Sequence, residues 1–291
     1  MTAEQANARL RSSVKRIGIL YHPLSDKAQA LSQQIEELLS SHGVSSWQCS
    51  THDEDIARPH IAETDLILSI GGDGTILRAA RITAPSSVPI LGVNLGKLGF
   101  ITEISGDEAL SRLPGLLKGN GWIEERAMVE AVVEDTSFHA LNDAVLRSSA
   151  VRLVNIQAEV DGTVIATYRA DGIIAATATG STAYSLASGG PILHPLSRDI
   201  ILQPISCHLG LSHAVVLPPQ STVNLRVERR DRVVLCIDGQ VEVPLRTGQS
   251  VTIRLSSDTV RFLRIHEPSY FYSLIGTKLR GGSSGDSYRR S

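Results

Sequence analysis

The chain has 291 residues, of which 42% are hydrophobic and 20% charged, as in an ordinary globular protein. Its 28 basic and 30 acidic residues give a formal net charge of −2, which argues against a general nucleic-acid or membrane-surface binder. Three cysteines without paired spacing support neither a disulfide framework nor a zinc ribbon. The sequence contains no signal-peptide pattern and no apolar run near the ~20 residues of a membrane span. We therefore expect a cytoplasmic protein without nucleic-acid or membrane partners.

The first part of the chain alternates short apolar runs with helical patterns. After the first run, apolar residues recur at helical spacing, with Asp26 placed to cap the helix and Gly43 to end it. Another helical pattern covers 107–117. Such alternation predicts a parallel, Rossmann-like α/β sheet, in which ligands bind at the carboxyl ends of the strands. The predicted strands cover 16–22, 43–49, 66–70 and 88–94.

A glycine-rich turn, Gly-Gly-Asp-Gly-Thr at 71–75, follows the apolar run 66–70 and precedes a helical pattern that reaches Ile82. Glycines let backbone N–H groups approach a phosphate, and a helix start adds the positive end of its dipole. A carboxylate repels phosphate, so Asp73 needs another role, as a proton acceptor or a metal ligand. The alternative is a tight turn in which Asp73 caps the helix.

The helical signal almost vanishes from 124 to 265, where short β-branched segments are separated by Asp-Gly and Thr-Gly turns. This texture predicts a mostly-β domain of two packed sheets. We expect residues 1–105 to form the N-terminal α/β domain and 106–267 the β-sandwich-like domain. Residues 268–291 are expected to pack back on the first domain, with a helix at 269–279 and a disordered end.

Two polar groups of residues interrupt the β half. The stretch 169–192 gathers glycines and small hydroxyl residues between buried segments; it predicts a loop and helix start that line a polar ligand, or else a Ser/Thr-rich capping region. Asn142-Asp143 lies in an apolar stretch, where a buried amide and carboxylate are costly unless satisfied. That pair either closes a turn or holds ligand hydroxyls, as carboxylates hold ribose diols. Further along the chain, the spacing of His194, His208 and His213 matches no known metal-binding pattern.

Together these motifs resemble the NAD kinase family, in order and spacing, over nearly the whole chain. The glycine loop alone is shared with diacylglycerol and sphingosine kinases and, with variation, phosphofructokinases, whereas Thr-Gly-Ser-Thr-Ala-Tyr at 179–184 singles out NAD kinases. The chain departs from the family pattern at Ala178, where proline is common, and around Cys207 and His213. The matching motifs are residues 71–75, 142–143, 177–192 and 238–240.

The resemblance implies a kinase that moves the terminal phosphoryl group of ATP, or of polyphosphate, to the 2′-hydroxyl of the adenosine ribose of NAD, giving NADP. Mg²⁺ would be carried by the phosphate donor, with no metal ligand assigned among protein side chains. Asp73 is the expected base for the hydroxyl proton, with the donor near Gly72, Gly74, Thr75 and Arg78. Members are typically homo-oligomers in which one subunit completes another's site, so a homodimer or homotetramer is expected.

For the dinucleotide, the resemblance implies that Asn142 and Asp143 hold the nicotinamide-side ribose and that Asp171 holds the nicotinamide amide. A lipid kinase sharing the glycine loop, or a non-catalytic NADP(H)-binding sensor, are the alternatives. Further contacts are expected from Arg152, Arg169, Thr182, Ala183, Tyr184, Ser185, Leu186, Ala187 and Gln240.

Overall fold

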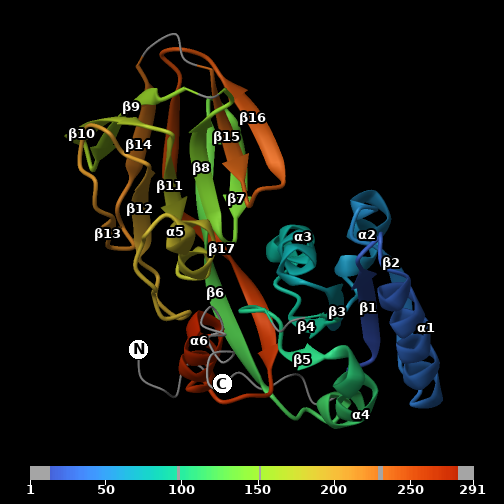
Figure 1. The fold of residues 1–291 in the computed structure, drawn as a ribbon. Coiled ribbons are helices and arrows are strands. Elements are labelled where there is room, and N and C mark those ends of the chain that lie inside the picture. Colours follow the sequence, from blue (N-terminus) through green and yellow to red (C-terminus); the bar gives the residue numbers. More distant parts are fainter. Residues whose placement is uncertain (1–13, 97–98, 151, 229–231, 281–291) are drawn as a thin grey trace, which may run out of the picture.

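The structure, a computed structural model, describes residues 14–96, 99–150, 152–228 and 232–280. The end predicted to be disordered is residues 280–291, of which 281–291 lie outside the described residues. Figure 1 shows an α/β part, coloured blue to cyan, beside a taller β part coloured green to orange. In those four described ranges, no helix is both long enough and apolar enough to cross a bilayer.

The α/β part is a parallel sheet covered by helices. Its elements are β1 (Arg16–Tyr21), α1 (Asp26–Ser41), β2 (Ser45–Ser50), α2 (Glu54–Ile61), β3 (Leu66–Gly71), α3 (Asp73–Thr83), η1 (Ala84–Ser86), β4 (Ile90–Asn94), β5 (Ile104–Ser105) and α4 (Gly106–Leu117). The strands pair in the order β2-β1-β3-β4-β5, all in parallel. Strand β3 is buried at every position, as expected of a strand covered on both faces. The predicted α/β sheet is confirmed.

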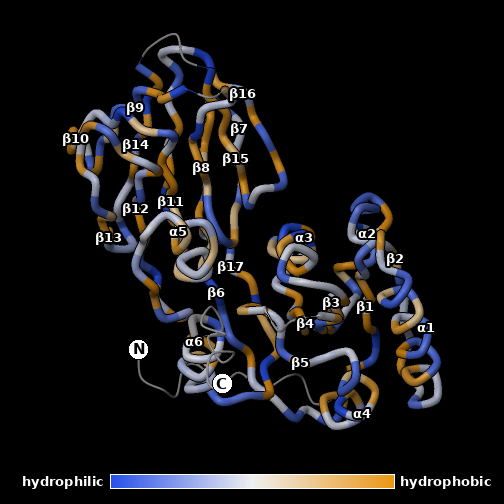
Figure 2. Tube along the Cα trace, in the orientation of Figure 1, coloured by the Kyte–Doolittle hydropathy of each residue, from blue (hydrophilic) through white to orange (hydrophobic). Residues whose placement is uncertain are grey.

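Local signals at α1 and α2 were interpreted less well. The Oγ of Ser25, not the carboxylate of Asp26, caps α1 by accepting the Ala28 N–H at 3.2 Å. Asp26 is the first helical residue, where its charge faces the positive end of the helix dipole. Figure 2 shows polar and apolar residues alternating along α1, the pattern that predicted it. Helix α2 was missed because its eight polar-rich residues include Pro59 and carry little periodic signal.

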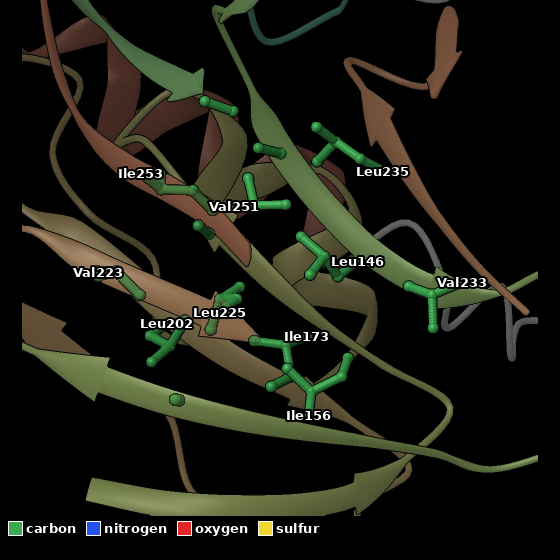
Figure 3. Packing of buried hydrophobic residues seen from close by; sticks show 14 of the residues in the cluster. Leu146, Ile156, Ile173, Leu202, Val223, Leu225, Val233, Leu235, Val251 and Ile253 are labelled. Atoms are coloured by element: carbon green, nitrogen blue, oxygen red, sulfur yellow. The ribbon is translucent and has the colours of Figure 1, made fainter. Parts of the chain in front are cut away.

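The β part consists of two packed sheets. Its elements are β6 (Trp122–Val133), β7 (Thr136–Ala140), β8 (Asp143–Ser148), β9 (Val154–Val160), β10 (Thr163–Ala170), β11 (Gly172–Ala176), η2 (Gly180–Thr182), α5 (Tyr184–Ala187), β12 (Ile200–Ile205), β13 (Val215–Leu217), β14 (Val223–Val227), β15 (Val233–Ile237), β16 (Val241–Leu245), β17 (Ser250–Arg264) and α6 (Tyr270–Arg280). One sheet has the order β13-β12-β11-β8-β15-β16, and the other includes β10-β9-β14-β17 with β6 and β7. In Figure 3, Leu146 and Ile173 from the first sheet face Leu225 from the second. The mostly-β, sandwich-like part is therefore confirmed.

Strand β17 joins the two parts in one sheet. It pairs with β6 along most of its 15 residues, and Phe262 near its end lies opposite Ile90 of β4. A register shift between Leu255 and Thr259 interrupts the pairing with β6, and such irregularities bend and twist a strand. One sheet of the β part thus continues into the parallel sheet. The boundary between residues 105 and 106 stays a prediction.

Helix α6 contacts segments from both parts. The Nζ of Lys278 lies 4.9 Å from the ring centroid of Phe100, which follows β4. The ring of Phe271 lies 5.5 Å from that of His194, which follows α5. The C-terminal helix is therefore close to the loops at the junction of the two parts.

Candidate active site

The turn between β3 and α3 opens the helix N-terminus to the surroundings. A Cβ at Gly71 would collide with the side chain of Thr75, so the tight turn itself requires this glycine. Gly72 is the N-cap of α3 and offers no side chain to its first N–H groups. A Cβ at Gly72 or Gly74 would meet nothing within 4 Å. N–H groups without a side-chain cap, next to free space at Gly72 and Gly74 and at the positive end of the helix dipole, suit an anion.

Asp73 is the first residue of α3 rather than its cap, so the interpretation of this residue as a helix cap is wrong. Its Oδ2 accepts the N–H of Phe100 at 3.1 Å, and its Oδ1 accepts that of Ile101 at 3.4 Å. A Cβ at Gly99 would overlap the Asp73 carboxylate. The lack of a side chain at Gly99 therefore lets the carboxylate of Asp73 lie against this segment.

Gln240, in the turn between β15 and β16, reaches across to α3. Its Nε2 donates to the backbone oxygen of Gly74 at 3.0 Å, and its Oε1 accepts from Arg81 at 3.3 Å. Arg81 also forms an ion pair with Glu54 of α2. The half-buried Arg78 lies one helical turn after Gly74. The sequence did not single out Arg81 and Glu54, because their contacts join residues far apart in the chain.

The Asp238 carboxylate organises the turn before β8. It accepts the backbone N–H groups of Leu141 at 2.9 Å, Asn142 at 2.7 Å and Asp143 at 3.1 Å. The N–H of Asp238 in return donates to the backbone oxygen of Asp143 at 3.0 Å. Asp238 belonged to a recognised motif but was not predicted as a site residue. Its role depends on a contact between distant segments that the sequence does not reveal.

Asp143 and Asp238 form a buried carboxylate pair. Burial, reinforced by the charge of Asp238, raises the pKa of Asp143 to about 7. Burial also raises the pKa of Asp238 to about 6, although its three backbone N–H bonds act in the opposite direction. Because neighbouring buried carboxylates resist ionising together, the pair retains a proton near neutral pH. It can both donate and accept hydrogen bonds, which suits a hydroxyl-rich ligand.

The two polar groups predicted in the β half lie against each other. The N–H of Thr177 donates to the Asn142 oxygen at 2.9 Å, and its hydroxyl donates to the Leu141 oxygen at 2.6 Å. A Cβ at Gly180 would collide with the Asn142 backbone. The glycine after β11 therefore allows the hydroxyl-rich loop to sit directly on the Asn142 turn.

Three polar atoms in these segments are buried and have no hydrogen-bond partner among the described residues. They are Oγ1 of Thr75, Oδ1 of Asn142 and Oγ of Ser185. Buried polar atoms of this kind are usually satisfied, by protein, water or ligand. Ser185 lies in α5, whose first residue, Tyr184, is 43% exposed. A ligand that contacts α3, the Asn142 turn and α5 would find an unused polar atom in each of them.

Two family models match the chain. The ATP-NAD kinase N-terminal domain matches residues 24–120, and the ATP-NAD kinase C-terminal domain matches residues 141–265. The chain belongs to the NAD kinase family. An NAD kinase of Dehalococcoides mccartyi is 42% identical over 276 residues, covering 92% of this chain and 97% of that protein. One of Chloroflexus aurantiacus is 39% identical over 274 residues, covering 92% and 99%.

Solved structures agree with this membership. An NAD kinase from Archaeoglobus fulgidus in complex with ATP matches with a TM-score of 0.76 at 27% identity, covering 90% of this chain and 97% of that chain. A yeast NADH kinase complexed with NADH has a TM-score of 0.81 at 23% identity, covering 97% and 91%, and shows the shared fold. The predicted family, fold and enzyme class are confirmed, and the NAD kinase interpretation is favoured over the lipid kinase and sensor alternatives.

Three of the residues that the NAD kinase resemblance suggested lie elsewhere in this chain. Arg169, near the end of β10, and Asp171 both precede the start of β11, and the exposed Arg152 follows β8 at the same end of the sheet. Asp143 instead lies opposite Ala176, at the other end of β11. At the usual strand rise, the two ends of β11 are roughly 13 Å apart. One chain alone does not bring these three residues to the Asn142 turn.

The departure from the NAD kinase pattern at Ala178 leaves the local turn intact. Ala178 is buried, and its backbone oxygen accepts the hydroxyl hydrogen of Ser181 at 2.6 Å. The Ser181 hydroxyl also accepts the N–H of Leu193 at 3.0 Å. These bonds hold the loop in shape without the ring of a proline.

Proposed function

We propose that this chain transfers the terminal phosphoryl group of ATP to the 2′-hydroxyl of the adenosine ribose of NAD, with Asp73 as the base. The 2′-oxygen forms a bond to the terminal phosphorus, the bond from that phosphorus to the bridging oxygen breaks, and ADP leaves. The hydroxyl proton passes to the Asp73 carboxylate. The observation that carries this proposal is the fixed carboxylate of Asp73 beside an open, uncapped helix N-terminus.

The donor phosphates would lie over the glycine turn. Open space above Gly72 and Gly74 leaves room for them, the N-terminus of α3 favours negative charge, and the unpartnered hydroxyl of Thr75 can bond a phosphate oxygen. Arg78, one turn later, would add a cation. The Archaeoglobus relative in complex with ATP supports ATP as donor; polyphosphate is the competing donor.

Mg²⁺ would arrive on the donor's phosphate oxygens. Among the described residues, no three His, Cys, Asp or Glu side chains are grouped so that they could hold a metal ion. The single carboxylate of Asp73 and the open N–H groups are compatible with a metal that phosphate oxygens and water coordinate. The metal would supply neutralisation of the charge on the transferring group.

NAD would occupy the adjoining loops. Asn142 and Asp143 would hold a ribose, since the Asn142 Oδ1 is unpartnered and the Asp143 carboxyl, with its pKa raised to about 7, can donate or accept a hydrogen bond near neutral pH. The other dinucleotide contacts would come from Thr182, Ala183, Tyr184, Ser185, Leu186, Ala187 and Gln240.

A homodimer or homotetramer would complete the site. Asp171, Arg169 and Arg152 lie far from the Asn142 turn of their own chain, so they would serve the site of a neighbouring subunit. The exposed apolar side chain of Leu209, whose backbone pairs with that of Arg169, supports contact with another copy. We place the reaction in the cytoplasm, in agreement with three cysteines that are all free thiols.

The test incubates the purified protein with NAD and Mg²⁺, and with ATP or polyphosphate in separate reactions, and measures NADP formation. We expect NADP with ATP, and we expect Asp73→Asn to bind NAD normally while losing most turnover. Asp65→Asn is the matched control, because the Asp65 carboxylate also accepts two backbone N–H groups, at 2.8 and 3.0 Å, but away from the turn. Absence of NADP with either donor would overturn the proposal, and near-normal turnover of Asp73→Asn would remove Asp73 as the base.

A further inference from the structure

A buried network of four charged side chains lies between the two halves of the proposed site. Its members are Glu103, Glu124, Arg126 and Arg264, each 4–6% exposed. Two carboxylates balance two guanidinium groups, so the network is neutral as a whole. Burying ionised groups is costly unless each has close partners. The partners of the two arginines therefore show which segments of the site the network holds in place.

Arg264, at the end of β17, holds the segment that anchors Asp73. Its Nε donates to Glu124 at 2.6 Å. Its Nη1 donates to the Ile101 backbone oxygen at 2.7 Å and to Glu103 at 3.0 Å. The N–H of Ile101 is one of the two backbone groups that bind the Asp73 carboxylate. The guanidinium therefore fixes the residue against which the carboxylate rests.

Arg126, on β6, holds the loop proposed to bind the dinucleotide. Its Nη2 pairs with Glu124 at 2.9 Å, and its Nη1 donates to the Thr179 hydroxyl at 3.3 Å. Thr179 is the N-cap of η2, and its backbone oxygen accepts the Thr182 hydroxyl at 3.1 Å. The adjacent Gly180 lies against the Asn142 turn. Glu124 thus connects one arginine directed at Asp73 with another directed at this loop.

An aromatic ring restrains both guanidinium groups. The Cζ of Arg264 lies 4.9 Å from the centroid of the Phe262 ring, and that of Arg126 lies 5.8 Å from it. A planar guanidinium that contacts a ring and bonds several partners is held in a single orientation. A lysine would keep the charge but could not reproduce this geometry.

We propose that Arg264 and Arg126 are positioning residues for phosphoryl transfer, Arg264 setting the place of Asp73 and Arg126 that of the dinucleotide loop. This inference rests on the proposed function, in which Asp73 takes the ribose proton. Phosphoryl transfer depends mainly on the positions of the reacting groups. Because the arginines share Glu124, a single rigid network determines how far the base lies from the ribose hydroxyl.

The first test compares Arg264→Lys with Arg254→Lys. Arg254 is a matched control: it also lies on β17 and bonds a β6 glutamate, Glu130, at 2.8 Å, but it is 54% exposed and contacts neither loop. For Arg264→Lys we expect kcat to fall roughly 10- to 100-fold while KM for NAD stays within about twofold. Arg254→Lys should leave both constants unchanged. Equal kcat in the two variants, or an Arg264→Lys protein that does not fold, would overturn the role given to Arg264.

The second test uses Thr179→Val, which removes the hydroxyl without changing any charge. We expect KM for NAD to rise about fivefold or more with kcat nearly unchanged. Thr252→Val, on β17, is the control for the change of side chain and should have no effect. An unchanged KM for NAD in Thr179→Val would overturn the role given to Arg126.

The third test is the double variant Arg264→Lys with Asp73→Asn. If Arg264 acts through Asp73, the double variant loses no more turnover than Asp73→Asn alone. Additive losses would overturn the inference while leaving the proposed function intact. Wild-type turnover in Asp73→Asn alone would instead refute the proposed base, so the two failures are distinguishable.

Discussion

The side chain of Gln240 donates a hydrogen bond of 3.0 Å to the backbone oxygen of Gly74. This bond joins the turn between β15 and β16 to the first turn of α3. It therefore ties the β part to the loop where the donor would bind. The contact with Arg81 at 3.3 Å holds the Gln240 amide in one orientation.

Gln240→Leu removes both bonds at nearly constant volume. We expect a loss of about 0.5–3 kcal/mol in the free energy of unfolding and a fall in kcat/KM of roughly tenfold, because the glycine turn loses its contact with the β part. Gln249→Leu is the control, since the Gln249 side chain also joins two turns that are distant in the sequence, by donating to Glu134 at 2.6 Å. Thermal unfolding and initial rates measure the two effects. A similar fall in kcat/KM for both variants would contradict this role of Gln240.

Gly99→Ala should damage catalysis more than folding. The new methyl group would overlap the Asp73 carboxylate, so the carboxylate must leave its place between the two amides. We expect kcat to fall about 100-fold, with NAD binding retained. Gly96→Ala is the control, because a Cβ there meets nothing within 4 Å. Comparable turnover in the two alanine variants would show that the position of Asp73 does not limit the rate.

Gly74→Ala should separate stability from donor binding. The methyl group meets no protein atom within 4 Å, and alanine in a helix gains about 0.5–1 kcal/mol over glycine. The same methyl group would enter the space proposed for the phosphates, so we expect KM for ATP to rise. Gly276→Ala in α6 should give the stability gain without the kinetic change. Steady-state kinetics at varied ATP concentration measures KM for ATP in both variants. An unchanged KM for ATP in Gly74→Ala would count against this placement of the donor.

Asp143→Asn should make stability less dependent on pH. The folded pKa of Asp143, about 7, lies above its ordinary value of 3.8, so between these values the folded chain retains a proton that the unfolded chain has lost. The contribution of Asp143 to the free energy of unfolding of the wild type therefore falls as the pH rises from about 4 to about 7, and it is lowest above about pH 7. The free energy of unfolding of the variant should exceed that of the wild type by on the order of 1–4 kcal/mol at about pH 8 and by little at about pH 4.

Asp238→Asn is the contrasting variant for that experiment. The Asp238 carboxylate accepts three backbone N–H groups, and an amide would present a donor to one or more of them. We expect this variant to be less stable than wild type at about pH 5 by roughly 1–3 kcal/mol for each N–H left unpaired. Thermal unfolding across the pH range tests both variants. Parallel curves for wild type and Asp143→Asn would refute the assigned pKa shift.

The parts of this protein that could be predicted from sequence are those encoded by neighbouring residues. The buried strand before Gly71, the helix after it and the hydroxyl-rich loop around Gly180 all have local signals in spacing and residue type. The contacts of Asp238 with the Asn142 turn and of Arg264 with Glu124 have none, because their partners are nearly a hundred residues or more away. The continuation of β17 into the parallel sheet was missed for the same reason.

The long pairing of β17 with β6, on both sides of its register shift, also limits how this enzyme can move. Enzymes whose two lobes are joined by flexible linkers admit substrates by swinging the lobes apart. Here the connection is a pair of long hydrogen-bonded strands, and a large swing would break ladder bonds. We therefore expect breathing motions to be concentrated in short peripheral segments such as α5, with the distance between the two halves nearly constant through the catalytic cycle.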